Sequence, residues 1–167
     1  MALLEHRPGP GYPASMKQSF LLLLERWSHW EGLRSWITAT LVYLVLFDLV
    51  LVTWVFTAPE LWFTVWHGVP GDDSAGFLKR CGANWAAFLL FQSIALWRWK
   101  REPWWLLVVA GVRLSDIFTD LTVSMVAHDL TWTGAVLLPA GSLMNLVLGS
   151  WLICAWHMGE MAATRGR

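Results

Sequence analysis

Charged residues are scarce in this sequence. Aspartate, glutamate, lysine and arginine make up 14% of its 167 residues, whereas a soluble domain contains about 25%. The shortage is concentrated in four apolar blocks separated by short polar stretches, and the mean hydropathy of the chain is +0.48. Because acidic and basic residues balance at a net charge of zero, the composition shows no basic face for nucleic acid. The scarcity of charge therefore predicts a protein of the lipid bilayer.

Other features are missing, and each absence narrows the function. The two cysteines, Cys81 and Cys154, lie in different apolar blocks without a C-x-x-C pattern, so neither a disulfide framework nor a zinc site is predicted. The N-terminus has no basic stretch followed by an apolar core, so no cleavable signal peptide is expected. The motifs H-E-x-x-H and G-x-S-x-G and a phosphate-cradling glycine loop are absent. We therefore predict no catalytic residue and no bound metal, and we favour a protein that is not an enzyme.

Four apolar segments are each near the ~20 residues that a helix needs to cross a bilayer. They cover residues 35–57, 80–98, 104–127 and 134–156. Pro103 stands just before the third segment, where proline suits the first turn of a helix. The sequence therefore predicts an all-α integral membrane protein, with four transmembrane helices in a bundle over residues 35–157.

The segments outside this bundle are expected to differ from one another. Residues 1–15 are rich in proline and glycine, which predicts an irregular N-terminal tail. Residues 16–34 show the pattern of an amphipathic helix, and Ser15 with Gln18 fits a capping box at its start. Such a helix either lies in the membrane interface or extends the first transmembrane helix into the cytoplasm. Residues 158–167 are expected to form a cytoplasmic tail.

Basic residues are distributed unequally between the two sides of the predicted bundle. With the N-terminus inside the cell, nine lysines and arginines lie on the inner side. The outer side then has only Lys79 and Arg80. Cytoplasmic loops of membrane proteins carry the excess of lysine and arginine. The asymmetry predicts that both termini are cytoplasmic, in what we expect to be the inner membrane of a bacterium.

The sequence contains fourteen tryptophans. Indole prefers the headgroup level of a bilayer, where it forms aromatic belts. The inner group consists of Trp27, Trp30, Trp36, Trp97, Trp99, Trp104, Trp105 and Trp156. The outer group consists of Trp54, Trp62, Trp66, Trp85 and Trp132. This placement predicts two interfacial belts, and contacts with a partner subunit, a lipid or a pigment are the alternative.

One apolar segment carries a stripe of charge. In GVRLSDIFTDLTVS, residues 111–124, the spacing of Arg113, Asp116 and Asp120 is three and four residues, so the three share one face of a helix. An ionised side chain in the middle of a membrane costs at least ~2.5–3.5 kcal/mol. We therefore expect these side chains to face other helices inside the bundle rather than lipid.

The first and fourth segments supply polar groups at a similar depth. Asp48 lies within YLVLFDLVLV and Asn145 within GSLMNLVLG. We expect Arg113 to pair with Asp48 and Asp116, with Asn145 as a hydrogen-bonding neighbour. The intramembrane polar cluster predicted from the sequence is then Asp48, Arg113, Asp116, Asp120 and Asn145.

Three further polar residues form a second tier around this cluster: Asn84, Gln92 and Arg80. Asp120 is expected to reach either water or Arg80. Since three carboxylates face one guanidinium, we expect at least one aspartate to be protonated. The cluster predicts either a proton- or cation-binding site or a structural network that fixes the register of the helices.

Four histidines are candidate cofactor ligands. His67 and His128 are expected on the outer side, and His29 and His157 on the inner side. Imidazole is a common axial ligand of haem, so two histidines on each side fit a haem or a magnesium pigment. All four lie at helix ends or in loops, where histidine is ordinary. We therefore predict no cofactor and keep haem or a magnesium pigment as an alternative.

Small size, few residues outside the membrane and the lack of a catalytic motif together favour a non-catalytic role. The leading interpretation is an accessory or structural subunit of a larger membrane complex, such as a respiratory or photosynthetic one. Its expected partners are the lipid bilayer and other membrane protein subunits. The alternative is a small transporter, or a ligand- or proton-binding membrane protein, built on the Arg/Asp cluster. A haem- or pigment-binding membrane protein is the third interpretation.

Overall fold

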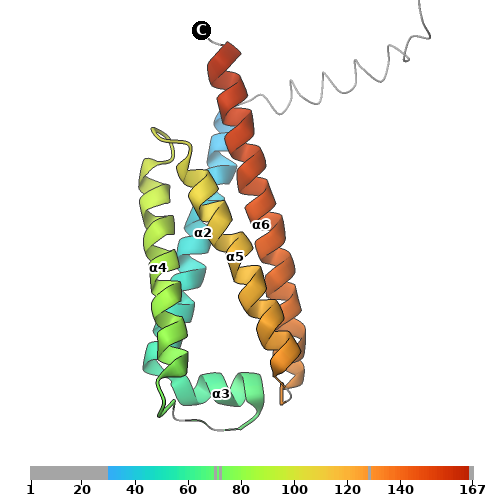
Figure 1. Cartoon of the computed structure of the whole chain (residues 1–167). Helices are drawn as coiled ribbons and strands as arrows, with labels where there is room; N and C mark the ends of the chain where they lie inside the picture. Colours follow the sequence, from blue (N-terminus) through green and yellow to red (C-terminus); the bar gives the residue numbers. More distant parts are fainter. Residues whose placement is uncertain (1–29, 70, 72, 128, 166–167) are drawn as a thin grey trace, which may run out of the picture. The chain divides into compact units, whose positions relative to one another are not determined.

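The computed structural model describes residues 30–69, 71, 73–127 and 129–165, and within these ranges it contains five α-helices and no β-strand (Figure 1). The helices are α2 (Trp30–Thr57), α3 (Pro59–His67), α4 (Phe77–Arg98), α5 (Trp105–Val126) and α6 (Trp132–Arg165). The chain divides into two units, Met1–Trp36 and Ile37–Arg167. The described part of the first unit is the opening turns of α2, and the other described helices belong to the second. The predicted all-α class is confirmed for the described residues.

Two of these helices are long and apolar enough to cross a membrane. Their apolar stretches are Gly32–Thr57 in α2 and Trp132–Met161 in α6. α4 and α5 have 22 residues each, or about 33 Å at 1.5 Å per residue, which matches the ~30 Å hydrocarbon core of a bilayer. α5 differs from the two candidate spans in having three ionisable residues, Arg113, Asp116 and Asp120, in its middle. Length and composition therefore mark two candidate membrane helices, and the four transmembrane helices predicted from the sequence stay a prediction.

The second unit is a bundle in which α5 packs along α6 and α4 packs on α5 (Figure 1). Glycines allow close approach between its helices. A methyl group on Gly149 of α6 would lie 2.9 Å from Cγ of Leu114 on α5. A methyl group on Gly82 of α4 would lie 2.8 Å from Cγ1 of Val55 on α2. Small residues thus place α5 directly against α6, and α2 directly against α4.

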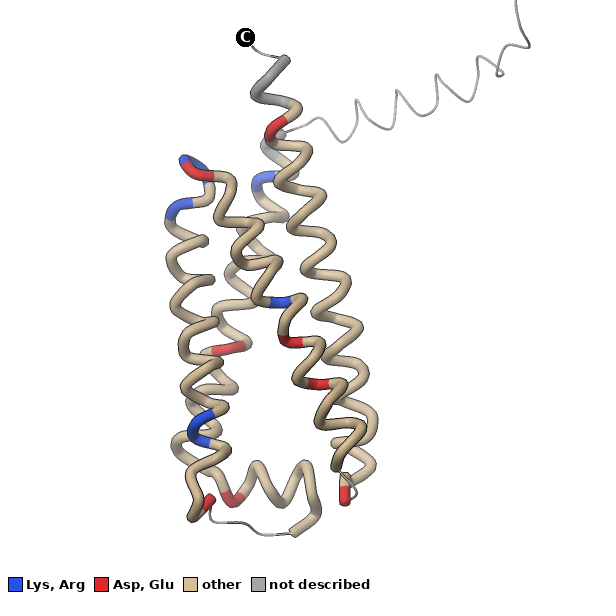
Figure 2. Tube along the Cα trace, viewed as in Figure 1, with Lys and Arg blue, Asp and Glu red and all other residues tan. Residues whose placement is uncertain are grey.

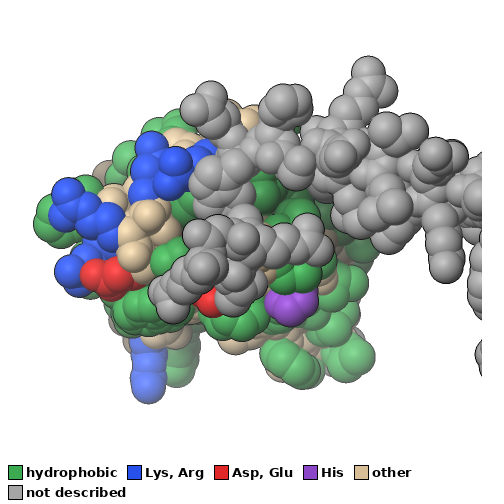
Figure 3. All heavy atoms as spheres, turned by 90° about the horizontal axis from the view of Figure 1, so that it is seen from above, with side chains coloured by type: hydrophobic (Ala, Val, Ile, Leu, Met, Phe, Trp, Pro, Cys, Tyr) green, Lys and Arg blue, Asp and Glu red, His purple; other side chains and the backbone are tan. Residues whose placement is uncertain are grey.

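The bundle is apolar on its outer faces and polar at its centre. The buried residues of α2 recur along one face at helical spacing: Ile37, Leu41, Leu44, Asp48 and Val55. Large hydrophobic side chains are exposed on all four long helices, among them Leu46, Val50, Leu90, Phe118, Leu146 and Val147. Charged residues lie near helix ends or at the interior positions of α2 and α5 (Figure 2). Seen end-on, many of the described side chains that are visible are hydrophobic, and lysine and arginine gather at one edge (Figure 3).

The segment between α2 and α4, which the sequence analysis left as a long loop, contains the short helix α3. Pro59 stands in its first turn, and Gly68 ends it with a left-handed φ of 69°. The hydroxyl of Thr131 donates to the carbonyl oxygen of Val65 at 2.6 Å, and its N–H donates to that of Trp66 at 2.9 Å. These bonds tie α3 to the connection between α5 and α6, so α3 lies across one end of the bundle (Figure 1).

Two of the long helices run beyond the apolar segments predicted from the sequence. α2 begins at Trp30, so residues 30–34 continue the first long helix and do not end a separate interfacial helix. No proline interrupts this region, and a helix extends readily once its first turns have formed. α6 continues to Arg165, so residues 158–165 are helical, and their assignment to a cytoplasmic tail stays a prediction. The predicted tail 1–15 and most of the predicted helix 16–34 lie outside the described residues.

Candidate functional site

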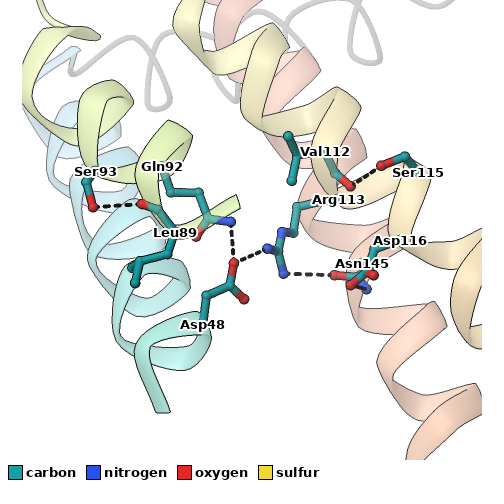
Figure 4. A network of polar contacts seen from close by, with 9 residues as sticks. All are labelled: Asp48, Leu89, Gln92, Ser93, Val112, Arg113, Ser115, Asp116 and Asn145. Carbon is teal, nitrogen blue, oxygen red and sulfur yellow. Dashed lines mark hydrogen bonds and ion pairs between the residues drawn. The ribbon is translucent and has the colours of Figure 1, made fainter. Parts of the chain in front are cut away.

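Arg113 of α5 and Asp48 of α2 form an ion pair at the centre of the bundle (Figure 4). Nη2 of Arg113 donates to Oδ2 of Asp48 at 2.5 Å, and each side chain is only 1% exposed. The same carboxylate oxygen accepts a hydrogen bond from Nε2 of Gln92 on α4 at 2.8 Å. The guanidinium also lies 5.9 Å from the ring centroid of Phe88. Two donors, one of them cationic, therefore compensate the buried carboxylate of Asp48.

Asn145 of α6 links this ion pair to a second carboxylate. Its Oδ1 accepts from Nη1 of Arg113 at 3.5 Å, and its Nδ2 donates to Oδ2 of Asp116 at 3.2 Å. The indole of Trp85 on α4 also approaches Asp116. The central network therefore comprises Asp48, Gln92, Arg113, Asp116 and Asn145 (Figure 4). Each of the four long helices contributes at least one polar side chain to it.

Asp120 lies one helical turn beyond Asp116 and outside the ion pair. Ser142 of α6 approaches it, and a methyl group on Gly141 would lie 3.2 Å from its Oδ2, so a small residue leaves room for the carboxylate. Arg80, the partner suggested from the sequence, is exposed near the start of α4. Within the described ranges, no ion pair joins Asp116 or Asp120 to a lysine or arginine. Two of the three carboxylates thus face the interior without an ionic partner.

Two neighbouring cavities adjoin these two carboxylates. The larger has a volume of about 290 Å³ and is bounded mainly by α3, α4 and α5. The smaller has a volume of about 110 Å³ and is bounded by α2, α3, α5 and α6, with one residue of α4. Asp116 and Asp120 line both, and Asn84 and Thr119 add polar groups to the larger. Where the chain is described, no lysine or arginine lines either cavity.

Tryptophan forms the other half of the cavity wall. Trp62 of α3 is the centre of a cluster: its ring centroid lies 5.3 Å from those of Trp54, Trp66 and Trp85. Trp62, Trp66 and Trp85 line both cavities. The sequence analysis assigned these three to an outer interfacial belt, and the structure instead gathers them around the carboxylates. The reason is α3, which lies across the end of the bundle and turns two indoles, one helical turn apart, toward its interior.

Two of the four histidines predicted as cofactor ligands, His67 and His157, lie within the described residues. His67 ends α3 and borders the larger cavity. His157 lies roughly 25 residues, or about 38 Å, beyond the start of α6. His29 and His128 lie outside the described residues. Within the described part of the chain, no group of three or more histidine, cysteine, aspartate or glutamate side chains is placed to hold a metal ion.

No family model, curated protein or solved structure matches this chain. The site is therefore defined by its own geometry. It consists of an ion-pair network across four helices and, next to it, an aromatic cavity with two carboxylates.

The sequence analysis assigned the aromatic residues of the site to a membrane interface and did not place them in the site, although the sequence contains signals for that placement. Trp62 and Trp66 are four residues apart, between a proline that starts a helix and a glycine that ends one. Trp85 is seven residues before Gln92, so the two share a face of α4. Ser142 shares a face of α6 with Asn145 in the same way. Such spacing shows which residues share a face, but not which other helix that face meets.

Proposed function

We propose that this chain is a four-span integral membrane protein that binds a small ligand inside its helix bundle. α2, α4, α5 and α6 are the four spans, and lipid covers their apolar outer faces. The observation that carries the proposal is the cavity of about 290 Å³, which has the carboxylates of Asp116 and Asp120 in its wall. A concave, mostly apolar site with a few convergent polar groups is the form that ligand sites take. Ionisable residues inside a membrane point to function in the same way.

The central network provides a rigid support beside this site. Asp48 and Arg113 neutralise each other, and Asn145 holds Asp116 in place at 3.2 Å. The network therefore fixes the orientation of one cavity carboxylate without forming an ion pair with it. A binding site is most precise when hydrogen bonds and packing lock its side chains on rigid helices.

A cysteine already present in the cavity wall makes the proposal testable. Cys81 lines the larger cavity, whereas Cys154 lies on α6 and lines neither cavity. The purified full-length protein in mild detergent is treated with N-ethylmaleimide, alone and with each member of a panel of small cationic, neutral and anionic molecules. Mass spectrometry then measures alkylation of both thiols. We expect at least one compound to slow alkylation of Cys81 and to leave Cys154 unchanged. If no compound does so, the ligand-binding function is wrong.

The orientation and location of the bundle also belong to this proposal. Arg98, Lys100 and Arg101 stand at the turn between α4 and α5, at the end opposite α3. The positive-inside rule puts this turn in the cytoplasm. Both termini are then cytoplasmic, the membrane is a bacterial inner membrane, and the cavity beneath α3 is reached from the outer side.

The expectation of an accessory subunit stays a prediction, because it concerns partners outside this chain. Extraction in mild detergent followed by native mass measurement tests it: stoichiometric partners favour the subunit, and a lone chain or homo-oligomer counts against it. An absorption spectrum of the same sample tests the haem or pigment interpretation.

A further inference from the structure

We propose that the ligand of this cavity is an organic monocation, such as an amine or a quaternary ammonium compound. It is held by the carboxylates of Asp116 and Asp120 and by the indole rings of Trp62, Trp66 and Trp85. This inference rests on the ligand-binding function proposed above and adds the chemical class of the ligand.

The charge of the site is the first argument. Of the three interior carboxylates, only Asp48 has an ionic partner within the described residues, namely Arg113. Asp116 accepts a hydrogen bond from the neutral amide of Asn145, and the uncharged side chains of Trp85 and Ser142 lie near Asp116 and Asp120 respectively. Uncompensated charge is costly in a low-dielectric interior. With Asp48 and Arg113 paired, the carboxylates of Asp116 and Asp120 remain. One bound monocation would neutralise one of them and one proton the other. An anion would be repelled, and with a neutral ligand and one proton one carboxylate would stay uncompensated.

The aromatic wall is the second argument, and it is independent of the first. The ring centroid of Trp62 lies 5.3 Å from that of Trp66 and 5.3 Å from that of Trp85. All three rings line the cavities that the carboxylates adjoin. The face of an indole ring attracts a cation, and tryptophan is the best side chain for this purpose. Rings from two helices around one space form the aromatic cage that suits alkylated ammonium groups.

The rest of the wall decides between an organic and an inorganic cation. A calcium ion takes six to eight oxygen ligands, and a magnesium ion demands near-octahedral oxygen coordination. Beyond the two carboxylates, the larger cavity offers only Thr119 and Asn84 as polar oxygen-bearing side chains, and most of its wall is aromatic or aliphatic. Its volume of about 290 Å³ also exceeds what a bare ion fills. The site therefore fits a cation that brings its own apolar groups.

Two probes of the same shape test the charge of the ligand. Choline and 3,3-dimethylbutan-1-ol differ by one atom, because a carbon replaces the charged nitrogen in the alcohol. Alkylation of Cys81 in the full-length protein is measured over a concentration series of each, with Cys154 as the internal control. We expect choline to protect Cys81 at a concentration at least about tenfold lower than the alcohol, since desolvated cation–π contacts and charge pairing act on choline alone.

The possible outcomes separate this inference from the proposed function. Equal protection by the two probes overturns the cation and leaves the ligand-binding function standing. The same holds if only neutral or anionic members of the panel protect Cys81. If nothing protects Cys81, both proposals fall.

Variants then localise the binding. Asp120→Asn and Trp85→Leu should each raise the concentration of choline needed for protection about tenfold, and leave the effect of the alcohol unchanged. Trp97→Leu is the matched control, because Trp97 lies on the same helix as Trp85 but is 82% exposed and lines neither cavity. If choline protects the Asp120→Asn protein as well as the parent, the cation does not bind at this carboxylate and the inference is wrong. The comparison of the two probes on the parent protein stands even if a variant fails to fold.

Discussion

Replacing Arg113 by leucine tests whether the central ion pair holds the bundle together. In the parent, Asp48 is 1% exposed and accepts one bond from Arg113 and one from Gln92. The variant leaves this carboxylate with a single neutral donor. Removing one partner of a buried ion pair costs about 3–5 kcal/mol, because the other charge stays buried without compensation. We therefore expect Arg113→Leu to lose that much unfolding free energy, or to fail to accumulate.

A second substitution shows whether charge is the cause. Asp48→Asn added to Arg113→Leu removes the orphaned charge, and the new amide can donate to Oε1 of Gln92, which has no hydrogen-bond partner in the parent. Asn145 still loses its donor, at a cost of about 1 kcal/mol. The double variant should therefore recover at least about half of the loss, which amounts to roughly 2 kcal/mol.

The assay is reversible unfolding in mixed micelles, followed by far-ultraviolet circular dichroism. The matched control is Arg98→Leu, which breaks the pair with Glu102, whose two side chains are 48% and 34% exposed. Such a pair is worth only about 0.3–0.5 kcal/mol. If Arg113→Leu unfolds like Arg98→Leu, Arg113 does not compensate a buried charge and the reasoning about the network is refuted. Because neither Asp48 nor Arg113 lines a cavity, the double variant should also keep the choline response of the parent.

Three further predictions address packing, topology and partners. Gly149→Ala should destabilise the bundle by about 1–3 kcal/mol, since its methyl group would overlap α5. Gly111→Ala, which meets nothing within 4 Å, should be neutral or stabilising by up to ~1 kcal/mol, and equal unfolding of the two variants contradicts the packing argument. Ala75 is exposed between α3 and α4, so the new thiol of Ala75→Cys should react with an impermeant maleimide on intact cells. The new thiol of Lys100→Cys should not react, and the reverse pattern would contradict the proposed orientation. Deleting residues 1–15 should weaken retention of any copurifying subunit, and unchanged retention counts against the accessory role.

Much of the fold could be predicted from local pattern. Apolar segments near ~20 residues placed four long helices, because their length must match the bilayer. The three- and four-residue spacing of Arg113, Asp116 and Asp120 put them on one face, because a helix has 3.6 residues per turn. The cost of exposing such charges to lipid predicted that this face would turn inward. These inferences need nothing beyond the chain's own periodicity and the properties of its surroundings.

The tertiary structure decided how those faces meet. Periodicity shows that Gln92 and Asn145 lie on inner faces, but only the packing makes Gln92 a donor to Asp48 and places Asn145 between Arg113 and Asp116. The crosswise course of α3 likewise depends on its bonds to Thr131, 65 residues further along the chain. That course converts tryptophans typical of a membrane interface into the wall of a cavity. Helical spacing is a local property, whereas the angle and depth at which helices cross are set by side chains distant in sequence. The sequence by itself therefore determined the helices and the polarity of their faces, and the packing alone created the cavity.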